Sequence, residues 1–128
     1  MFEPIRDAGL HVWFHSDGWI LDIIEDLIDI GVTILNPQHA CMGSDAVAGI
    51  TGNKICIRTD IDRQWTIPFG TAEEIVEAVQ DAIAKFGSHG GGVILHGEIG
   101  PDVPYENIET LYSSFYRYGR YPLDWNNR

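Results

Sequence analysis

Polar side chains able to do chemistry follow four short apolar runs, at the point where each run ends. They are His15 and Asp17, Asn36 and Gln38, Asp60 and Asp62, and His96 and Glu98. If the runs are parallel strands, their carboxyl ends meet at one edge of a sheet, where α/β proteins build their active sites. A polar surface loop is the simpler interpretation of any one cluster. Four such clusters together favour a common site.

His15 and Asp17 give this edge the chemistry of a metal site. An imidazole and a carboxylate two residues apart can turn toward a common point, and both are zinc ligands. His96 would supply a third ligand and leave the fourth coordination position open. Alternatively, Asp17 caps the helix that begins near Trp19, and His15 is a hydrogen-bonded histidine of the core. The role of His39, in a loop, stays open.

Strand-like runs alternate with helix-like segments, and this alternation must position the polar clusters. Strands are expected over residues 10–15, 32–35, 55–59 and 90–95. Helices are expected over residues 19–30, over 45–50 with Ser44 as cap, over a segment from the capping box at Thr71 to Gly87, and over 105–118. Four βα units in series predict a parallel sheet with right-handed crossovers. The strand runs are nearly continuously apolar, which is typical of strands with both faces covered.

Length and composition restrict the class of protein. The chain has 128 residues, 45% of them hydrophobic and 21% charged, which is typical of one folded domain. Its net charge is −11, so nucleic acid and anionic membrane surfaces are unfavourable partners, and a small-molecule substrate is expected instead. We expect a cytoplasmic protein, because no signal peptide or membrane span is visible and two cysteines are too few for a disulfide framework.

The motifs of the chain resemble those of the uroporphyrinogen decarboxylase family along nearly its whole length. The matching pieces are His15-Ser-Asp-Gly18, Ile30-Gly-Val-Thr-Ile-Leu-Asn-Pro37, Ile61-Asp with Phe69-Gly-Thr-Ala-Glu-Glu74, Gly91-Gly-Val-Ile-Leu95, and Pro101-Asp-Val-Pro-Tyr-Glu-Asn-Ile108. They look like the last four βα units of the family's barrel. The resemblance therefore implies an α/β fold that is the C-terminal half of a TIM (β/α)8 barrel, with residues 1–128 forming a single partial domain.

The resemblance implies one of two activities, and the His15-Ser-Asp-Gly18 motif favours the first, methyl transfer. Methyltransferase-type members move methyl groups between a corrinoid and a thiol, using zinc held by a His-x-Cys pair and a later Cys. Here His15 matches the first ligand, Asp17 stands where the Cys would be, and His96-Gly97-Glu98 occupies the loop of the later Cys. Zinc would therefore lie between His15, Asp17 and His96, or Glu98 would take the place of His96. The alternative is cofactor-free decarboxylation of uroporphyrinogen in porphyrin biosynthesis, with His96 binding or protonating the substrate. Candidate catalytic residues are His96 and Asp17, and candidate substrate-binding residues are Asn36, Gln38, Asp60 and Glu98.

If the chain is half a barrel, we also expect it to bind a protein partner. Four parallel strands cannot close, so two strand edges and the inner face of the sheet stay open. We expect the chain to pair with a separate N-terminal half-barrel or to associate with itself. A third possibility is a non-catalytic or truncated half whose only role is assembly.

Overall fold

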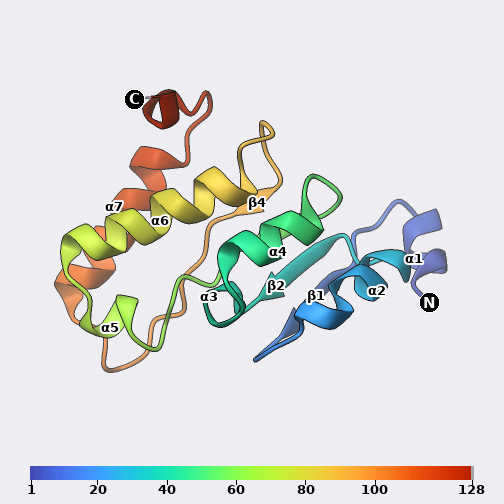
Figure 1. The fold of residues 1–128 in the computed structure, drawn as a ribbon, viewed down its shortest axis with the longest axis horizontal. Coiled ribbons are helices and arrows are strands. Elements are labelled where there is room, and N and C mark those ends of the chain that lie inside the picture. Colours follow the sequence, from blue (N-terminus) through green and yellow to red (C-terminus); the bar gives the residue numbers. More distant parts are fainter. Residues whose placement is uncertain (128) are drawn as a thin grey trace.

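The computed structural model describes residues 1–127, in which strands alternate with helices along the chain (Figure 1). The strands are β1 (Trp13–Ser16), β2 (Ile34–Pro37), β3 (Cys56–Arg58) and β4 (Val93–Ile94). The α-helices are α1 (Glu3–Asp7), α2 (Ile24–Asp29), α3 (His39–Met42), α4 (Ser44–Thr51), α5 (Thr66–Phe69), α6 (Ala72–Phe86) and α7 (Tyr105–Tyr118). Short 3₁₀ helices cover η1 (Leu21–Ile23) and η2 (Asp124–Asn127). Within residues 1–127, no helix is long and apolar enough to cross a bilayer.

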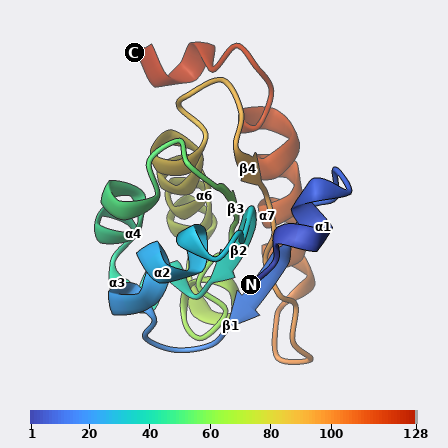
Figure 2. The same cartoon turned by 90° about the vertical axis from the view of Figure 1, so that its right-hand side faces the viewer.

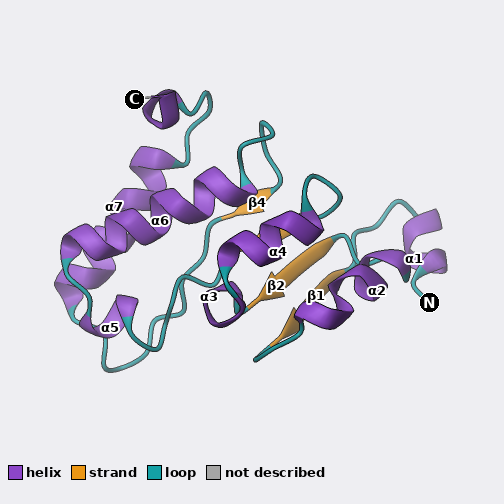
Figure 3. Cartoon of the chain, viewed as in Figure 1, coloured by secondary structure: helices purple, strands orange, loops and turns teal. Residues whose placement is uncertain are grey.

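The four strands form one sheet in the order β1-β2-β3-β4, with every neighbouring pair parallel (Figure 3). The predicted α/β class with a parallel sheet is therefore confirmed. The helices form a layer in the same order, because α2 contacts α4, α4 contacts α6, and α6 contacts α7. Figure 2 shows α2, α4 and α6 on one side of the strands. Each crossover thus adds its strand next to the preceding one and its helix to the same layer.

The two faces of the sheet differ because side chains alternate along each strand. Phe14, Leu35, Ile57 and Val93 lie in register across the sheet. Leu35 and Ile57 are fully buried in the core that the helices cover. The opposite face holds Trp13, which is 54% exposed, and Ile94, which is 36% exposed.

This second face, the open face, also carries polar side chains. His15 is paired with Asn36, and Arg58 with Ile94, in the register of the sheet. The helices cover only one face of the sheet, as half a barrel predicts. The strands were expected to be apolar on both faces, and on the open face they are not. The face without helices carries the imidazole of His15, the amide of Asn36 and the guanidinium of Arg58. The open face is therefore mixed in character rather than a continuous apolar surface.

The best-marked helices of the sequence form as expected. α7 spans Tyr105–Tyr118, the predicted range. α6 begins at the predicted capping box, in which the Thr71 hydroxyl accepts from the Glu74 amide at 3.2 Å and the Glu74 carboxylate accepts from the Thr71 amide at 2.7 Å. Such reciprocal bonds satisfy amides that a helix start leaves without partners.

Other boundaries differ from the expectation. The first helix begins only at Leu21, as a 3₁₀ turn, and the amide of buried Ile20 just before it is bonded to the Met42 sulfur at 3.2 Å. Ser44 is the first residue of α4 and not its cap; its hydroxyl pairs with His39 instead. The short helices α3 and α5 lie in the connections after β2 and β3. No apolar periodicity in the sequence predicts them.

Candidate functional site

The polar residues after the strands come together at the carboxyl edge of the sheet, with two exceptions. Asp62 supports the turn that leads into α5, since its carboxylate accepts the amides of Gln64 at 3.0 Å and Thr66 at 3.3 Å. Gln38 supports a loop, because its side-chain oxygen accepts the amide of Gly18 at 2.7 Å. Gly18 has a φ of +74°, a left-handed conformation that glycine adopts without strain. These two residues support the loops of the edge, and both also line the small hollow there.

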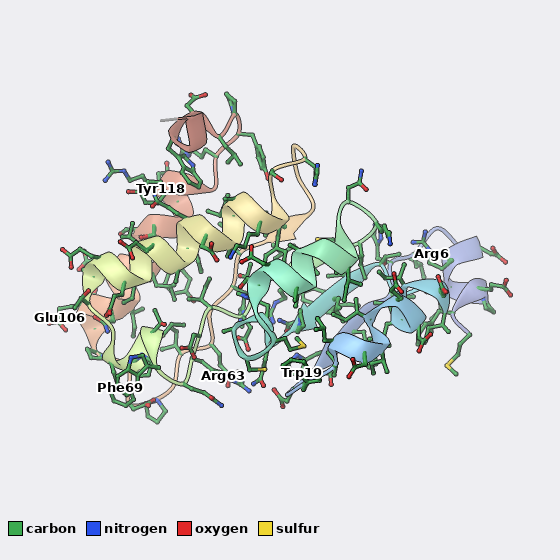
Figure 4. All side chains as sticks on the ribbon, viewed as in Figure 1. Arg6, Trp19, Arg63, Phe69, Glu106 and Tyr118 are labelled. Carbon is green, nitrogen blue, oxygen red and sulfur yellow. The ribbon has the colours of Figure 1, made fainter. Side chains whose placement is uncertain are left out.

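Arg63 lies at the centre of the edge and joins three of the strand-end loops. Its guanidinium pairs with Asp17 at 2.8 Å, with Asp60 at 3.9 Å, and with Glu98. These carboxylates follow β1, β3 and β4 respectively. Figure 4 shows Arg63 at the edge of the molecule between Trp19 and Phe69. One cation therefore holds together three segments that are far apart in the sequence.

Asp60 and His96 form the least solvated pair of the site. Asp60 is only 4% exposed, and its Oδ1 lies 3.9 Å from His96 Nδ1. Both atoms are buried and have no hydrogen-bond partner within residues 1–127. Burial raises the pKa of the Asp60 carboxyl, and burial, with the nearby charge of Arg58, lowers the pKa of His96. The pair is thus poised with a more basic carboxylate and a less basic imidazole than usual.

The backbone around His96 is held from both sides. The hydroxyl of Thr59, a fully buried residue, donates to the His96 carbonyl at 2.8 Å and accepts from the His96 amide at 2.7 Å. On the other side, a Cβ at Gly97 would lie 2.8 Å from Leu111 and 2.9 Å from Ile67. Gly97 therefore lets α7 and α5 close against the loop that positions His96.

His15 has a fixed ring. Its Nδ1 lies 2.9 Å from the Asn36 carbonyl, and its Nε2 lies 3.4 Å from Asp17 Oδ1. Because a carbonyl oxygen only accepts, Nδ1 carries the proton in this contact. The alternative reading of His15 as a core histidine is not what the structure shows, since its side chain is 47% exposed.

The three residues that the resemblance assigns to zinc do not form a ready-made ligand cluster in the part of the chain that the structure describes. No group of three His, Cys, Asp or Glu side chains suited to a metal ion occurs in residues 1–127. His15 contacts Asp17, whereas His96 contacts Asp60, and the carboxylate of Asp17 is engaged by the Arg63 cation. Zinc at His15, Asp17 and His96 stays a prediction, and we derive no step through a metal.

Two arginines of this region, Arg58 and Arg63, were not predicted as site residues from the sequence. Arg63 follows Asp60-Ile-Asp62 directly in the sequence. A cation next to clustered carboxylates is a signal for an ion pair, and this signal points to Arg63. Arg58 lies inside an apolar strand, where a charged residue is itself unusual and signals a partner or a ligand.

The open question of His39 is resolved by burial. The ring is 4% exposed, lies 2.9 Å from the Ser44 hydroxyl and contacts Phe86 edge-on, with ring centroids 5.2 Å apart. Burial lowers its pKa to about 4. His39 is therefore a neutral histidine of the core, on the helix side of the sheet.

The hollow at the carboxyl edge is small and is lined by side chains of the site and its neighbours: Gln38, Cys41, Asp60, Asp62, Arg63 and Gln64. A larger hollow lies at the opposite end of the strands, bordered by Thr33, Lys54 and the glycines 90–92. It contains none of the predicted site residues, and it is formed mainly by loops. The concentration of titratable groups places the candidate site at the carboxyl edge.

No protein-family model matches this chain, and no curated protein matches it. The resemblance to the uroporphyrinogen decarboxylase family therefore depends only on the motifs quoted above.

Proposed function

We propose that the chain is one half of a (β/α)8 barrel of the uroporphyrinogen decarboxylase type. The order of the strands supports this proposal, because each new strand of a barrel is added beside the last, whereas doubly wound sheets reverse direction at a switch point. The single helix layer supports it too. In a complete barrel, the open face of this sheet would be part of the interior, and Asp60, His96 and Arg63 would lie at its catalytic end.

Of the activities that the resemblance implies, we favour decarboxylation, with proton transfer to the substrate carbon that loses its carboxylate. The observation that carries this choice is the Asp60–His96 pair, whose facing Oδ1 and Nδ1 atoms are buried, unpartnered within residues 1–127 and 3.9 Å apart. A buried polar atom without a partner costs free energy, so such a pair is retained where a substrate or water completes it. The shifted pKa values of the two groups agree with a role as acid and base.

The proposed reaction is balanced without an additional reagent. The bond between a substrate carbon and its carboxylate breaks, carbon dioxide leaves, and the electron pair stays on the carbon. That carbon then takes a proton from the Asp60–His96 pair, which is reprotonated from solvent. Arg63 keeps Asp17, Asp60 and Glu98 close together throughout.

Methyl transfer with a corrinoid remains the competing proposal. It requires a metal that activates the thiol, and here Asp17 stands at the position of one family thiolate and the loop His96-Gly97-Glu98 at the other. Asp17 and Glu98 both pair with Arg63. A carboxylate that neutralises an arginine is a poorer metal ligand than a free one. This arrangement favours the decarboxylase-type reaction over the methyl transfer that the motif at His15 first suggested.

The activity is tested on the chain alone and on the chain co-expressed with the reading frame upstream of its gene. Uroporphyrinogen is supplied in one assay, with loss of carboxylates followed by chromatography, and a methylated corrinoid with coenzyme M in the other. We expect decarboxylation that Asp60→Asn and His96→Gln each reduce at least tenfold and that Glu109→Gln, an exposed change on α7, leaves unaltered. Methyl transfer, or decarboxylation that both site variants retain, would refute the proposal.

A further inference from the structure

Arg58 stands on the open face of the sheet without an acidic partner. It is half-buried at the end of β3, and no carboxylate of residues 1–127 lies within ion-pair distance of it. Arg63, five residues further along the chain, pairs with three carboxylates. A half-buried guanidinium loses part of its hydration, and an anionic ligand would compensate for that loss.

The guanidinium of Arg58 is held in place by neutral groups. Its Nη1 donates to Asn36 Oδ1 at 2.5 Å, and its central carbon lies 5.3 Å from the ring centroid of Trp13. An arginine has five N–H donors, so a single side-chain hydrogen bond leaves several of them available. The position is preorganised, because Asn36 is itself buried and bonded to the backbone of the neighbouring strand.

The surroundings of Arg58 are accessible to a ligand. Trp13 is 54% exposed and the side chain of His15 is 47% exposed, and both belong to the same face of the sheet as Arg58. The ring of Trp13 gives one apolar wall, and His15 and Asn36 give polar groups on the adjacent strands. A cation, an aromatic wall and fixed polar neighbours are the features of a site for a small organic anion.

We propose that Arg58, supported by Asn36 and Trp13, binds the carboxylate group of a small molecule on the open face of the sheet. The planar guanidinium fork matches a carboxylate, with which it forms two parallel hydrogen bonds. A dianionic phosphate matches the fork equally well, but Asp17, Asp60 and Glu98 crowd the same edge and the whole chain carries a charge of −11. Their repulsion is stronger against a dianion than against a monoanion.

This inference deepens the proposed function, since it names the group that would hold the substrate beside the Asp60–His96 pair. Binding and turnover are nevertheless separate measurements. If carboxylates bind at Arg58 and no proton transfer occurs, the binding site stands and the proposed activity fails. If decarboxylation occurs and carboxylates do not bind at Arg58, the activity stands and the binding site fails.

The experiment follows the side-chain N–H signals of arginine in the full chain by nuclear magnetic resonance at constant ionic strength. Sodium propionate is titrated in one series and sodium phosphate at neutral pH in the other. We expect a saturable shift of the Arg58 signal with propionate, and about tenfold weaker binding of phosphate, which corresponds to 1.4 kcal/mol.

Three variants accompany the titration. Arg58→Gln should weaken propionate binding at least tenfold, and Arg58→Lys, which keeps the charge without the planar fork, should give an intermediate affinity. Arg6→Gln on α1 should bind as the wild type does. If Arg58→Gln fails to fold, Arg58→Lys and the wild-type titration decide. No saturable shift at Arg58, unchanged binding in the lysine variant, or tighter binding of phosphate than of propionate would overturn the proposal.

Discussion

The side-chain amide of Asn36 forms two hydrogen bonds with Arg58, one with its guanidinium and one with its backbone carbonyl. Its Oδ1 accepts from the Arg58 guanidinium at 2.5 Å, and its Nδ2 donates to the Arg58 carbonyl at 3.1 Å. The same residue offers its own carbonyl to His15 at 2.9 Å. A buried amide on β2 therefore determines the positions of a histidine on β1 and an arginine on β3.

Replacing Asn36 should destabilise the protein and disturb both neighbours. Asn36→Ala leaves a half-buried guanidinium and a buried carbonyl with fewer partners, so we expect a loss of about 1–3 kcal/mol in the free energy of unfolding. Urea titration followed by circular dichroism measures it. Asn53→Ala, in an exposed turn, is the matched control and should change the stability by less than about 0.5 kcal/mol. Equal effects of the two substitutions would contradict this role for Asn36.

His39 should make the protein less stable as the pH falls. Its pKa is about 4 in the folded protein, against 6.5 for an unperturbed histidine, so the unfolded chain binds the extra proton first. The stability contribution of the neutral ring is complete above pH 6.5 and is lost as the pH falls toward 4. The loss from this residue amounts to about 3 kcal/mol. Asp81 and Asp62 oppose the effect of burial, and Lys85 reinforces it.

The comparison of His39→Gln with His89→Gln tests this. The glutamine at position 39 can still reach Ser44 but does not titrate, so the pH dependence of the unfolding free energy between pH 4 and 6.5 should become shallower. The exposed His89 is the control, and its replacement should leave the slope unchanged. An imidazole of His39 that titrates near pH 6.5 in the folded protein would show that the interpretation is wrong.

Arg63 should lower the pKa of Asp60, because its positive charge opposes the dominant effect of burial on that carboxyl. In Arg63→Gln we therefore expect the pKa of Asp60 to rise further. Carbon-13 resonances of the Asp60 carboxyl, followed through a pH titration, measure the change. Lys85→Gln removes a cation that pairs with Asp45 and Asp81 instead, and it should leave Asp60 unaffected. A fall in the pKa of Asp60 in the arginine variant would exclude the assigned ion pair.

The capping box at the start of α6 should contribute measurably to stability. Thr71→Ala removes the acceptor of the Glu74 amide and should cost about 1 kcal/mol. Thr71→Ser keeps the hydroxyl and serves as control, with a change of a few tenths of a kcal/mol at most. Thermal unfolding of the two variants beside the wild type gives the difference. Indistinguishable alanine and serine variants would mean that the box is formed but not stabilising.

The open face and the two free strand edges should lead to association. We expect the chain either to form a complex with a separate N-terminal half-barrel or to associate with a second copy, because exposed Trp13 and Ile94 and the unpaired edges of β1 and β4 gain partners there. Light scattering coupled to gel filtration gives the mass. A 14.3 kDa monomer that unfolds cooperatively at micromolar concentration and binds no hydrophobic dye would contradict this expectation.

Several features were predictable from the sequence because they depend on neighbours along the chain. The helix Tyr105–Tyr118 lies between Pro104 and Gly119, and the start of α6 is marked by a capping box of four residues, Thr71 to Glu74. Both signals act within one helical turn, so no tertiary information is needed to interpret them. The alternation of strands and helices likewise predicted the parallel sheet, since parallel neighbours require a crossover between them.

The tertiary structure alone determined which polar residues meet. Arg63 pairs with Asp17 and Glu98, which are 46 and 35 residues away, and His96 meets Asp60 rather than His15. The sequence places Arg58 in an apolar strand. Its position on the open face follows only from the register between β3 and β4 and from the helices lying on one side of the sheet. Local patterns determine secondary structure because propensity and capping act over a few residues. The partners of a charged side chain depend on the relative placement of whole strands, which packing of the assembled sheet against its helices decides.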